Sequence, residues 1–334
     1  MKEEKLKEES IFTKENKQKI SLILGLLVTL VVLYPFLQRS YYISKYSGTV
    51  LTDNWWIALN WIKENTPSCA VIATYWDPGH FITGIAKRPV VFDGASQNSL
   101  RTITLEGNLT RDEIEKIIGI SNFRIRRFTK DGKNYVNVTT ARIQDIATTL
   151  FTSDEEQAIK ILKRYLIPEC NNTMYYIASE DLLWKSQWWT YFSTWDPKTK
   201  KGNKYFYFPA QFAGSRKINE SKYYIYPLSR LEAIIIIEKD NDFELRFQVE
   251  NEIKTIRRFW YFSNNTFKEK IYENYDYDAT VFLSQDKSLA IYIPKELQDS
   301  LFTRMFLLNG AGLKRFEFVR NFGGEVKLFK VIFD

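Results

Sequence analysis

Residues 20–37 form one apolar stretch, ISLILGLLVTLVVLYPFL, without a charged side chain. As a helix rising roughly 1.5 Å per residue it would be about 27 Å long, close to the ~30 Å hydrocarbon core of a bilayer. Tyr34, Tyr41 and Tyr42 lie where the interfacial aromatic residues of membrane helices are found. A cleaved signal peptide is the alternative, but the stretch is long for one and no small-residue cleavage site follows it. We therefore expect a retained transmembrane helix over residues 20–38.

The distribution of basic residues predicts the orientation of this helix. Six lysines precede residue 20, whereas only Arg39 and Lys45 closely follow the apolar stretch. The positive-inside rule then makes residues 1–19 a cytoplasmic tail and places the rest of the chain outside the cell. The predicted location is the cell membrane, with a single pass, a cytoplasmic N-terminus and an exterior C-terminal domain.

Composition excludes several classes of protein. Of the 334 residues, 45% are hydrophobic, which is enough to bury a core and excludes a disordered chain. The 47 basic and 40 acidic residues are interspersed, and without a basic cluster after residue 40 we expect no nucleic-acid partner. The single histidine, His80, excludes a histidine-rich metal site within this chain. Cys69 and Cys170 could pair outside the cell or remain buried thiols.

Residues 39–200 alternate helical and short apolar patterns. Asp53 can cap a helix with apolar residues at helical spacing, and Asn65-Thr66-Pro67 ends it. Thr110-x-x-Glu113 is a capping box that opens a second helix, and Ser153-x-x-Glu156 has the same pattern. Helical spacing also predicts helices around residues 143–150 and 179–184. The strands predicted in this region are 71–73, 90–92 and 175–177.

After residue 200 the apolar period changes from helical spacing to two, which is typical of strands. The strands predicted there are 205–208, 223–226, 233–238, 243–249, 256–262, 280–283, 289–293, 316–319 and 326–333. We therefore predict an α+β fold with a single N-terminal transmembrane helix, a mixed α-rich core domain over residues 39–200 and a β-rich region over residues 201–334.

The motif Tyr75-Trp76-Asp77-Pro78-Gly79-His80 directly follows the predicted strand 71–73. It places large side chains with polar tips at the end of a strand, where ligands commonly bind. Asp-Pro-Gly is also an ordinary turn sequence and Trp76 could simply pack. The residues alone therefore leave a binding site and a structural turn both open.

The stretch from Asp53 to Ser99 resembles the start of the exterior domain of the archaeal-type oligosaccharyltransferase catalytic subunit. In that family a Trp-containing helix and an Asn-Thr-Pro stop precede a strand and a Trp-Trp-Asp-Tyr-Gly motif. Trp76, Asp77 and Gly79 match the motif, whereas Tyr75 replaces its first Trp and Pro78 replaces its Tyr. Further matches are Trp55, Trp56, Trp61, Arg88, Asp93 and Gly94.

A second similarity lies further along the chain. The family carries an Asp and a Lys on a short helix, usually as Asp-x-x-Lys. Asp181 and Lys185 are similar to this pair but lie four residues apart, a spacing that still puts both on one helical face.

The resemblance implies a role in protein N-glycosylation, the transfer of a lipid-linked oligosaccharide to the Asn of Asn-X-Ser/Thr sequons. In the family this pocket breaks no bond but binds the hydroxyl of the +2 Ser or Thr, with the Asp accepting a hydrogen bond from it. The substrate-binding residues implied here are Tyr75, Trp76, Asp77, Pro78, Gly79 and Lys185. No catalytic or metal-binding residue is expected in this chain.

The family's catalysis uses Mn²⁺ or Mg²⁺ held by acidic residues of a multi-span membrane region that this chain lacks. The partners implied are therefore a multi-span membrane part, an acceptor polypeptide and a lipid-linked oligosaccharide. Asp276-Tyr277-Asp278 spells Asp-x-Asp but fits a strand edge better than a metal site. The alternatives are a non-catalytic exterior binding or structural protein, anchored in the membrane with the same fold, or less favourably a carbohydrate-binding module built on Trp188, Trp189, Tyr191 and Phe192.

Overall fold

The computed structural model describes residues 14–46, 51–196, 198–240, 242–263 and 266–333. The chain divides into two units, Met1–Thr52 and Asp53–Asp334.

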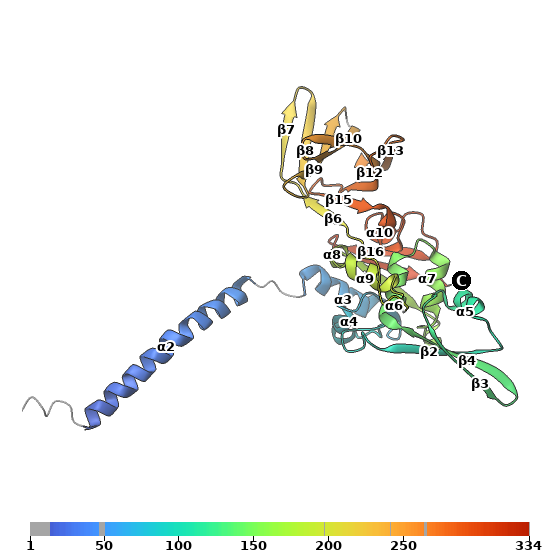
Figure 1. Cartoon of the computed structure of the whole chain (residues 1–334), viewed down its shortest axis with the longest axis horizontal. Coiled ribbons are helices and arrows are strands. Elements are labelled where there is room, and N and C mark those ends of the chain that lie inside the picture. The colour runs from blue at the N-terminus through green and yellow to red at the C-terminus, as the bar shows by residue number, and fades with distance from the viewer. Residues whose placement is uncertain (1–13, 47–50, 197, 241, 264–265, 334) are drawn as a thin grey trace, which may run out of the picture. The chain divides into compact units, whose positions relative to one another are not determined.

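In the first unit, helix α2 (Lys14–Tyr46) includes the predicted transmembrane segment and extends beyond it on both sides (Figure 1). Its apolar side chains are exposed, as in a helix that lipid surrounds. Within the described residues, Gln18–Lys45 is the one stretch long and apolar enough to cross a membrane. Residues 1–13 of the predicted cytoplasmic tail lie outside the described residues.

A four-stranded mixed sheet forms the centre of the second unit, with the strand order β1-β5-β17-β16. Strand β1 (Val71–Ala73) pairs in parallel with β5 (Met174–Ser179). Strand β17 (Val326–Val331) runs antiparallel to β5 and to β16 (Phe316–Phe322). The sheet therefore joins segments from both ends of this unit.

Helices surround this sheet. They are α3 (Asp53–Asn65), α4 (Gly79–Phe81), the π-helix η2 (Ile82–Ala86), α6 (Arg142–Phe151), α7 (Glu155–Lys163), the 3₁₀ turns η3 (Pro168–Cys170) and η4 (Lys295–Leu297), α8 (Asp181–Trp184), α9 (Ser186–Ser193) and α10 (Leu301–Phe306). The largest side chains of the core come from several of these elements and are almost fully buried, among them Tyr176, Trp189 and Phe302. The predicted helices of this region are confirmed, and α10 was not predicted. The predicted strand 90–92 is reduced to a single bridge between Ile72 and Val90.

A second, three-stranded sheet packs beside this core. Its order is β2 (Leu100–Glu106), β4 (Lys133–Ala141) and β3 (Arg124–Lys130), all antiparallel. One face packs on helix α5 (Arg111–Ile118), which the predicted Thr110–Glu113 capping box opens. The apolar pattern of the sequence does not predict this sheet, because β3 (RIRRFTK) is almost entirely exposed and carries few apolar residues.

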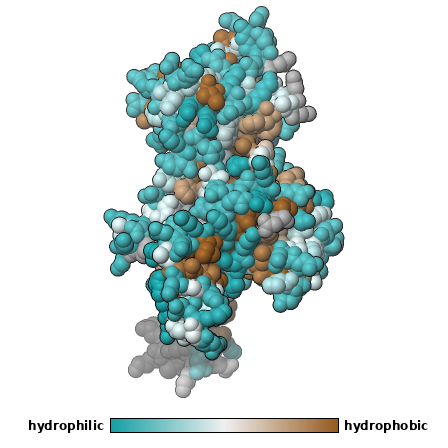
Figure 2. Space-filling view, turned by 90° about the vertical axis from the view of Figure 1, so that its right-hand side faces the viewer, coloured by the Kyte–Doolittle hydropathy of each residue, from teal (hydrophilic) through white to brown (hydrophobic). Residues whose placement is uncertain are grey.

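Between α9 and α10 the chain builds a lobe of two five-stranded sheets with a shared apolar core (Figure 1). One sheet contains β13 (Thr266–Ile271), β12 (Ile256–Ser263), β14 (Tyr277–Leu283), β15 (Leu289–Pro294) and β6 (Phe208–Gln211), and the other contains β11 (Glu252–Lys254), β10 (Asp242–Val249), β9 (Glu232–Lys239), β8 (Ser221–Pro227) and β7 (Gly214–Ile218). Figure 2 shows this lobe standing above the rest of the unit, with a mostly hydrophilic surface on the side in view. Most predicted strands are present here, whereas β7, β11 and β13 were not predicted.

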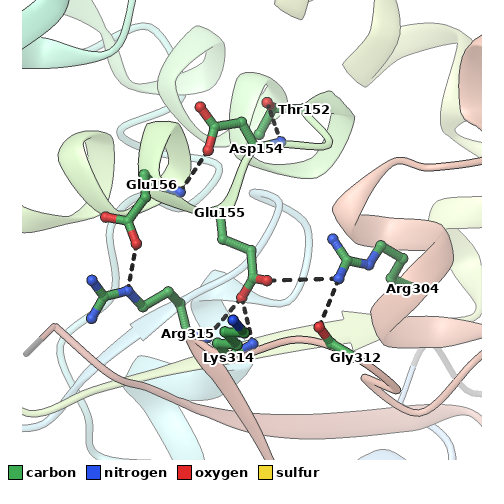
Figure 3. A network of polar contacts seen from close by, with 8 residues as sticks. All are labelled: Thr152, Asp154, Glu155, Glu156, Arg304, Gly312, Lys314 and Arg315. Atoms are coloured by element: carbon green, nitrogen blue, oxygen red, sulfur yellow. Dashed lines mark hydrogen bonds and ion pairs between the residues drawn. The ribbon is translucent and has the colours of Figure 1, made fainter.

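A polar network ties helix α7 to the segment between α10 and β16 (Figure 3). A Glu155 carboxylate oxygen accepts a hydrogen bond from the backbone N–H of Arg315 at 2.7 Å, and the other lies 3.6 Å from the Arg304 guanidinium. The N-cap of α7 is Asp154, whose carboxylate accepts from the backbone N–H two residues on. The predicted cap Ser153 is therefore wrong by one residue. Aspartate and serine cap equally well, so the pattern alone did not separate them.

Candidate functional site

The parallel pairing of β1 with β5 brings two distant motifs together. The carboxyl ends of parallel strands meet at one edge of a sheet, where open α/β sheets commonly bind ligands. The motif 75–80 follows the end of β1, and the segment with Asp181 and Lys185 follows the end of β5. At the opposite ends of the two strands, Cys69 and Cys170 form a disulfide. Of the two states that the sequence left open for these cysteines, the structure has the paired one.

The first two motif residues anchor the site to the core. The Tyr75 ring is 2% exposed and contacts the Phe92 ring edge-on, with 6.2 Å between the ring centroids. Trp76 is half-buried and packs against the main apolar cluster. Burial, reinforced by the nearby Asp77 carboxylate, raises the pKa of Tyr75 well above its ordinary value. Tyr75 is therefore a neutral wall residue at physiological pH.

Pro78 and Gly79 shape the turn that follows Asp77. Pro78 precedes α4 and has helical backbone angles, and its carbonyl accepts from the backbone N–H of Ile82 at 3.0 Å. A Cβ atom on Gly79 would lie 2.6 Å from Asp93 Cβ, so only glycine fits there. A Cβ on Gly94 would lie 2.7 Å from His80 Nε2. The glycines of the two matching segments therefore let those segments pack directly on each other.

Arg88, another residue that matches the family, has a structural environment. Its buried guanidinium donates hydrogen bonds to the carbonyls of Lys63 and Thr66, at 2.6 Å each, and to the Thr66 hydroxyl at 2.9 Å. These acceptors lie at the C-terminal end of α3, where helix carbonyls lack partners within the helix. Arg88 thus fixes the end of α3 beside the motif.

Asp77 and Lys185 form the polar centre of the site. Lys185 Nζ lies 3.0 Å from Asp77 Oδ1 and 2.8 Å from Asp181 Oδ2. The other Asp181 oxygen accepts a hydrogen bond from the Ser179 hydroxyl at 2.5 Å. Asp77 Oδ2 is buried, and among the described residues no group donates a hydrogen bond to it. The carboxylate is thus held by one oxygen and offers the other as an acceptor.

The electrostatics of Lys185 follow from its neighbours. Partial burial lowers the pKa of its ammonium group, but Asp181 and then Asp77 outweigh this effect and hold that pKa above its ordinary value. Lys185 therefore stays charged at neutral pH and screens the two carboxylates from each other. Asp181 and Lys185, four residues apart, form an ion pair, as expected for two side chains on one helical face.

A cavity of about 340 Å³ lies at this cluster. Tyr75, Trp76, Asp77 and Lys185 line it together, whereas Pro78 and Gly79 shape the turn and do not line it. Five further lining residues were not predicted as site residues: Gln97, Asn98, Ile143, Trp188 and Phe192. Trp188 and Phe192 were named from the sequence only for the less favoured carbohydrate-binding alternative, and Trp188 is 48% exposed. The exposed ring is what distinguishes it from a core position, and the sequence alone does not give its exposure.

The site offers a carboxylate acceptor, an ammonium group and aromatic walls. Among the described residues no cluster of three or more His, Cys, Asp or Glu side chains could hold a metal ion. In the Asp-x-Asp sequence, Asp278 instead pairs with Arg257 at 3.0 Å and with Lys295 at 2.7 Å. The geometry of the cavity suits recognition of a hydrogen-bond donor.

No protein-family model matches the chain. The dolichyl-phosphooligosaccharide-protein glycotransferase of Methanocaldococcus jannaschii is 23% identical over 310 residues, which are 80% of this chain and 32% of that protein. The protein of the same name from Methanococcus voltae is 26% identical over 200 residues, 53% of this chain and 21% of its own length. The chain thus spans about a third or less of the curated relatives it matches.

Among solved structures, the C-terminal domain of PglB from C. jejuni matches with a TM-score of 0.44 and 11% identity, covering 83% of this chain and 99% of that domain. The C-terminal globular domain of an oligosaccharyltransferase from Archaeoglobus fulgidus matches with a TM-score of 0.36 and 16% identity, covering 85% of this chain and all of that domain. The similarity to the archaeal glycotransferases confirms the resemblance predicted from the motifs. Across 80% of its length, this chain resembles the archaeal-type oligosaccharyltransferases of protein N-glycosylation.

Proposed function

We propose that this chain is part of an oligosaccharyltransferase, in which it binds the +2 Ser or Thr of the acceptor sequon. The whole enzyme would transfer a lipid-linked oligosaccharide to the sequon Asn. The observation that carries the recognition role is the buried Asp77 Oδ2, which has no donor among the described residues while Lys185 holds the other oxygen. A hydroxyl in the cavity would donate to this free acceptor position.

The cavity suits such a ligand in size and surroundings. Its volume of about 340 Å³ is sufficient for one or two short side chains. Tyr75, Trp76 and Trp188 line it with aromatic surface that limits the access of water. A hydrogen bond to a carboxylate strengthens when water is excluded, because the effective dielectric constant falls.

In this proposal the chain works with a multi-span membrane part that holds Mn²⁺ or Mg²⁺ and the lipid-linked oligosaccharide. The chain itself would be anchored by α2, with its N-terminus in the cytoplasm and the domain from Asp53 onward outside the cell. Transfer of glycan to an Asn-X-Thr peptide by the purified chain alone with Mn²⁺ would contradict this assignment. A purely structural or binding role would leave the chain without effect on transfer by the multi-span part.

A double-mutant cycle tests the recognition role. The full chain in lipid nanodiscs is titrated with an Asn-X-Thr peptide and with its Asn-X-Ala counterpart, for wild type and for Asp77→Ala. Loss of one charge-assisted hydrogen bond, worth about 1.5–3 kcal/mol, should weaken binding of the Thr peptide roughly 10- to 100-fold. The Ala peptide should bind both proteins equally weakly, because the two changes delete the same contact.

Asp112→Ala, on the exposed N-terminal turn of α5, is the matched control and should leave both affinities unchanged. Fully additive losses from the peptide and protein changes would mean that Asp77 does not contact the +2 hydroxyl.

A further inference from the structure

A second and larger cavity, of about 1060 Å³, is not lined by any of the residues proposed to bind the sequon. Helices α6 and α9, the segment after α5 and the turn η4 line it. Half of its twenty lining residues are Ser, Thr, Asn or Gln, and its charged residues are three basic and three acidic. Ligand cavities are usually lined mainly by apolar side chains. This composition therefore favours a neutral ligand with many hydroxyl groups.

Gln144 of α6 shows that the cavity has an unused polar group. Its side chain is only 8% exposed and lines the cavity, and no described residue forms a hydrogen bond with its carboxamide. The amide atoms face the solvent-filled cavity, where a carboxamide can donate and accept hydrogen bonds at once. Paired hydroxyls of a sugar ring offer both kinds of partner.

Other cavity residues are held in place by the protein. The Thr152 hydroxyl donates to Gln157 Oε1 at 2.5 Å, and Gln157 Nε2 donates to the Gly119 carbonyl at 2.9 Å. Asn122 Nδ2 donates to the Trp195 carbonyl at 2.9 Å and so joins the segments after α5 and after α9. The cavity is therefore largely pre-formed, which lowers the entropy cost of binding.

Aromatic surface completes the lining. The Phe151 ring stacks on Tyr205, with 5.8 Å between centroids and 9° between planes, so its orientation is fixed. Phe151 and Trp195 both line the cavity and are half-buried. Such rings can pack against the apolar C–H face of a sugar while the amides and hydroxyls bind its edge.

The second cavity lies next to the sequon-binding cavity along two shared helices. Ile143 and Phe192 line the cavity at Asp77, and the adjacent Gln144 and Ser193 line the second one. We propose that the second cavity binds a neutral oligosaccharide. This inference goes beyond the proposed function. If that function holds, the oligosaccharide could be the glycan of the lipid-linked donor or a glycan already attached to a protein.

The test measures binding of two probes to the full chain in nanodiscs, by saturation-transfer NMR and by Trp fluorescence. One probe is the oligosaccharide released by mild acid from the lipid extract of the source cells, and the other is a glycopeptide fraction from the same cells. Gln144→Leu removes the amide at nearly constant volume and should weaken binding about tenfold. Ser121→Trp, on the exposed rim, should abolish binding without disturbing the core. Gln211→Leu, exposed on β6, is the matched control and should bind like wild type.

Binding with these losses supports the proposal, and the probe that binds more tightly identifies the source of the glycan. Binding that is unchanged in both cavity variants, or absent from the wild type at millimolar probe, would overturn it. The sequon peptide serves as the internal reference, because both cavity variants should bind it like wild type. Asp77→Ala should lose peptide binding and keep glycan binding. Unchanged peptide binding in this variant would overturn the proposed function alone, so the two proposals can fail separately.

Discussion

Loss of the Cys69–Cys170 disulfide should lower the stability of the second unit by about 3–5 kcal/mol. The bond closes a loop with a sequence separation of 101 residues. The chain-entropy model assigns about 4.7 kcal/mol to a loop of about 100 residues, and measured values more often lie at 2–4 kcal/mol. At about 2 °C per kcal/mol for a domain of this size, the expected fall in Tm is about 6–10 °C.

Thermal unfolding of the full chain in detergent, followed by near-ultraviolet circular dichroism, measures this change. Cys69→Ser, Cys170→Ser and the double variant should have the same Tm, because each removes the same bond. Dithiothreitol should lower the Tm of the wild type alone. Sequon-peptide affinity at 20 °C should be unchanged, since hydrogen bonds of the β1–β5 pair remain. A fall of less than 2 °C in all variants would refute the argument that the disulfide constrains the unfolded chain.

Two further predictions concern stability. Gly79→Ala should lower the free energy of unfolding by about 1–3 kcal/mol, because the new Cβ would lie 2.6 Å from Asp93 Cβ. In the control Gly84→Ala the new Cβ has no atom within 4 Å, so stability should not change. Equal losses of stability for the two variants in urea unfolding would disprove the steric argument. Burial lowers the pKa of Lys327 to about 8, below its ordinary value of about 10.4. Between these values the unfolded chain binds more protons, so the stability of wild type relative to Lys327→Met should rise from pH 8 to 10.5. A Tm difference between wild type and Lys327→Met that stays constant from pH 8 to 10.5 would contradict this prediction.

Local signals in the sequence predicted local structure well. The capping box at Thr110 opens α5, and the Asn65-Thr66-Pro67 stop ends α3, because both effects act within a few residues. The sheet β2-β4-β3 was missed since β3 is stabilised by its neighbour strand and buries little of its own surface. Likewise, the sequence predicts β16 and β17 as strands of the β-rich region, whereas in the structure they belong to the central sheet. Which strands pair is decided by packing between distant segments.

The candidate site shows the same division. The motif and its resemblance singled out Asp77 and Lys185, and the structure places them 3.0 Å apart. The lining by Gln97, Asn98 and Ile143 was not predicted, because these residues reach the cavity through the tertiary fold and carry no local signal. The role of the cavity in binding the sequon stays a prediction.

The position of β17 has a consequence for how the protein is made. Strand β5 is paired on one side by β1 and on the other by β17, which follows β5 much later in the chain. At about 5–20 residues per second, roughly 8–30 s separate the synthesis of Ser179 from that of Val331. During this interval one edge of β5 has no native partner and is open to pairing with another chain. A nascent chain that stalls before residue 326 would therefore expose an aggregation-prone strand directly beside the segment that carries Lys185.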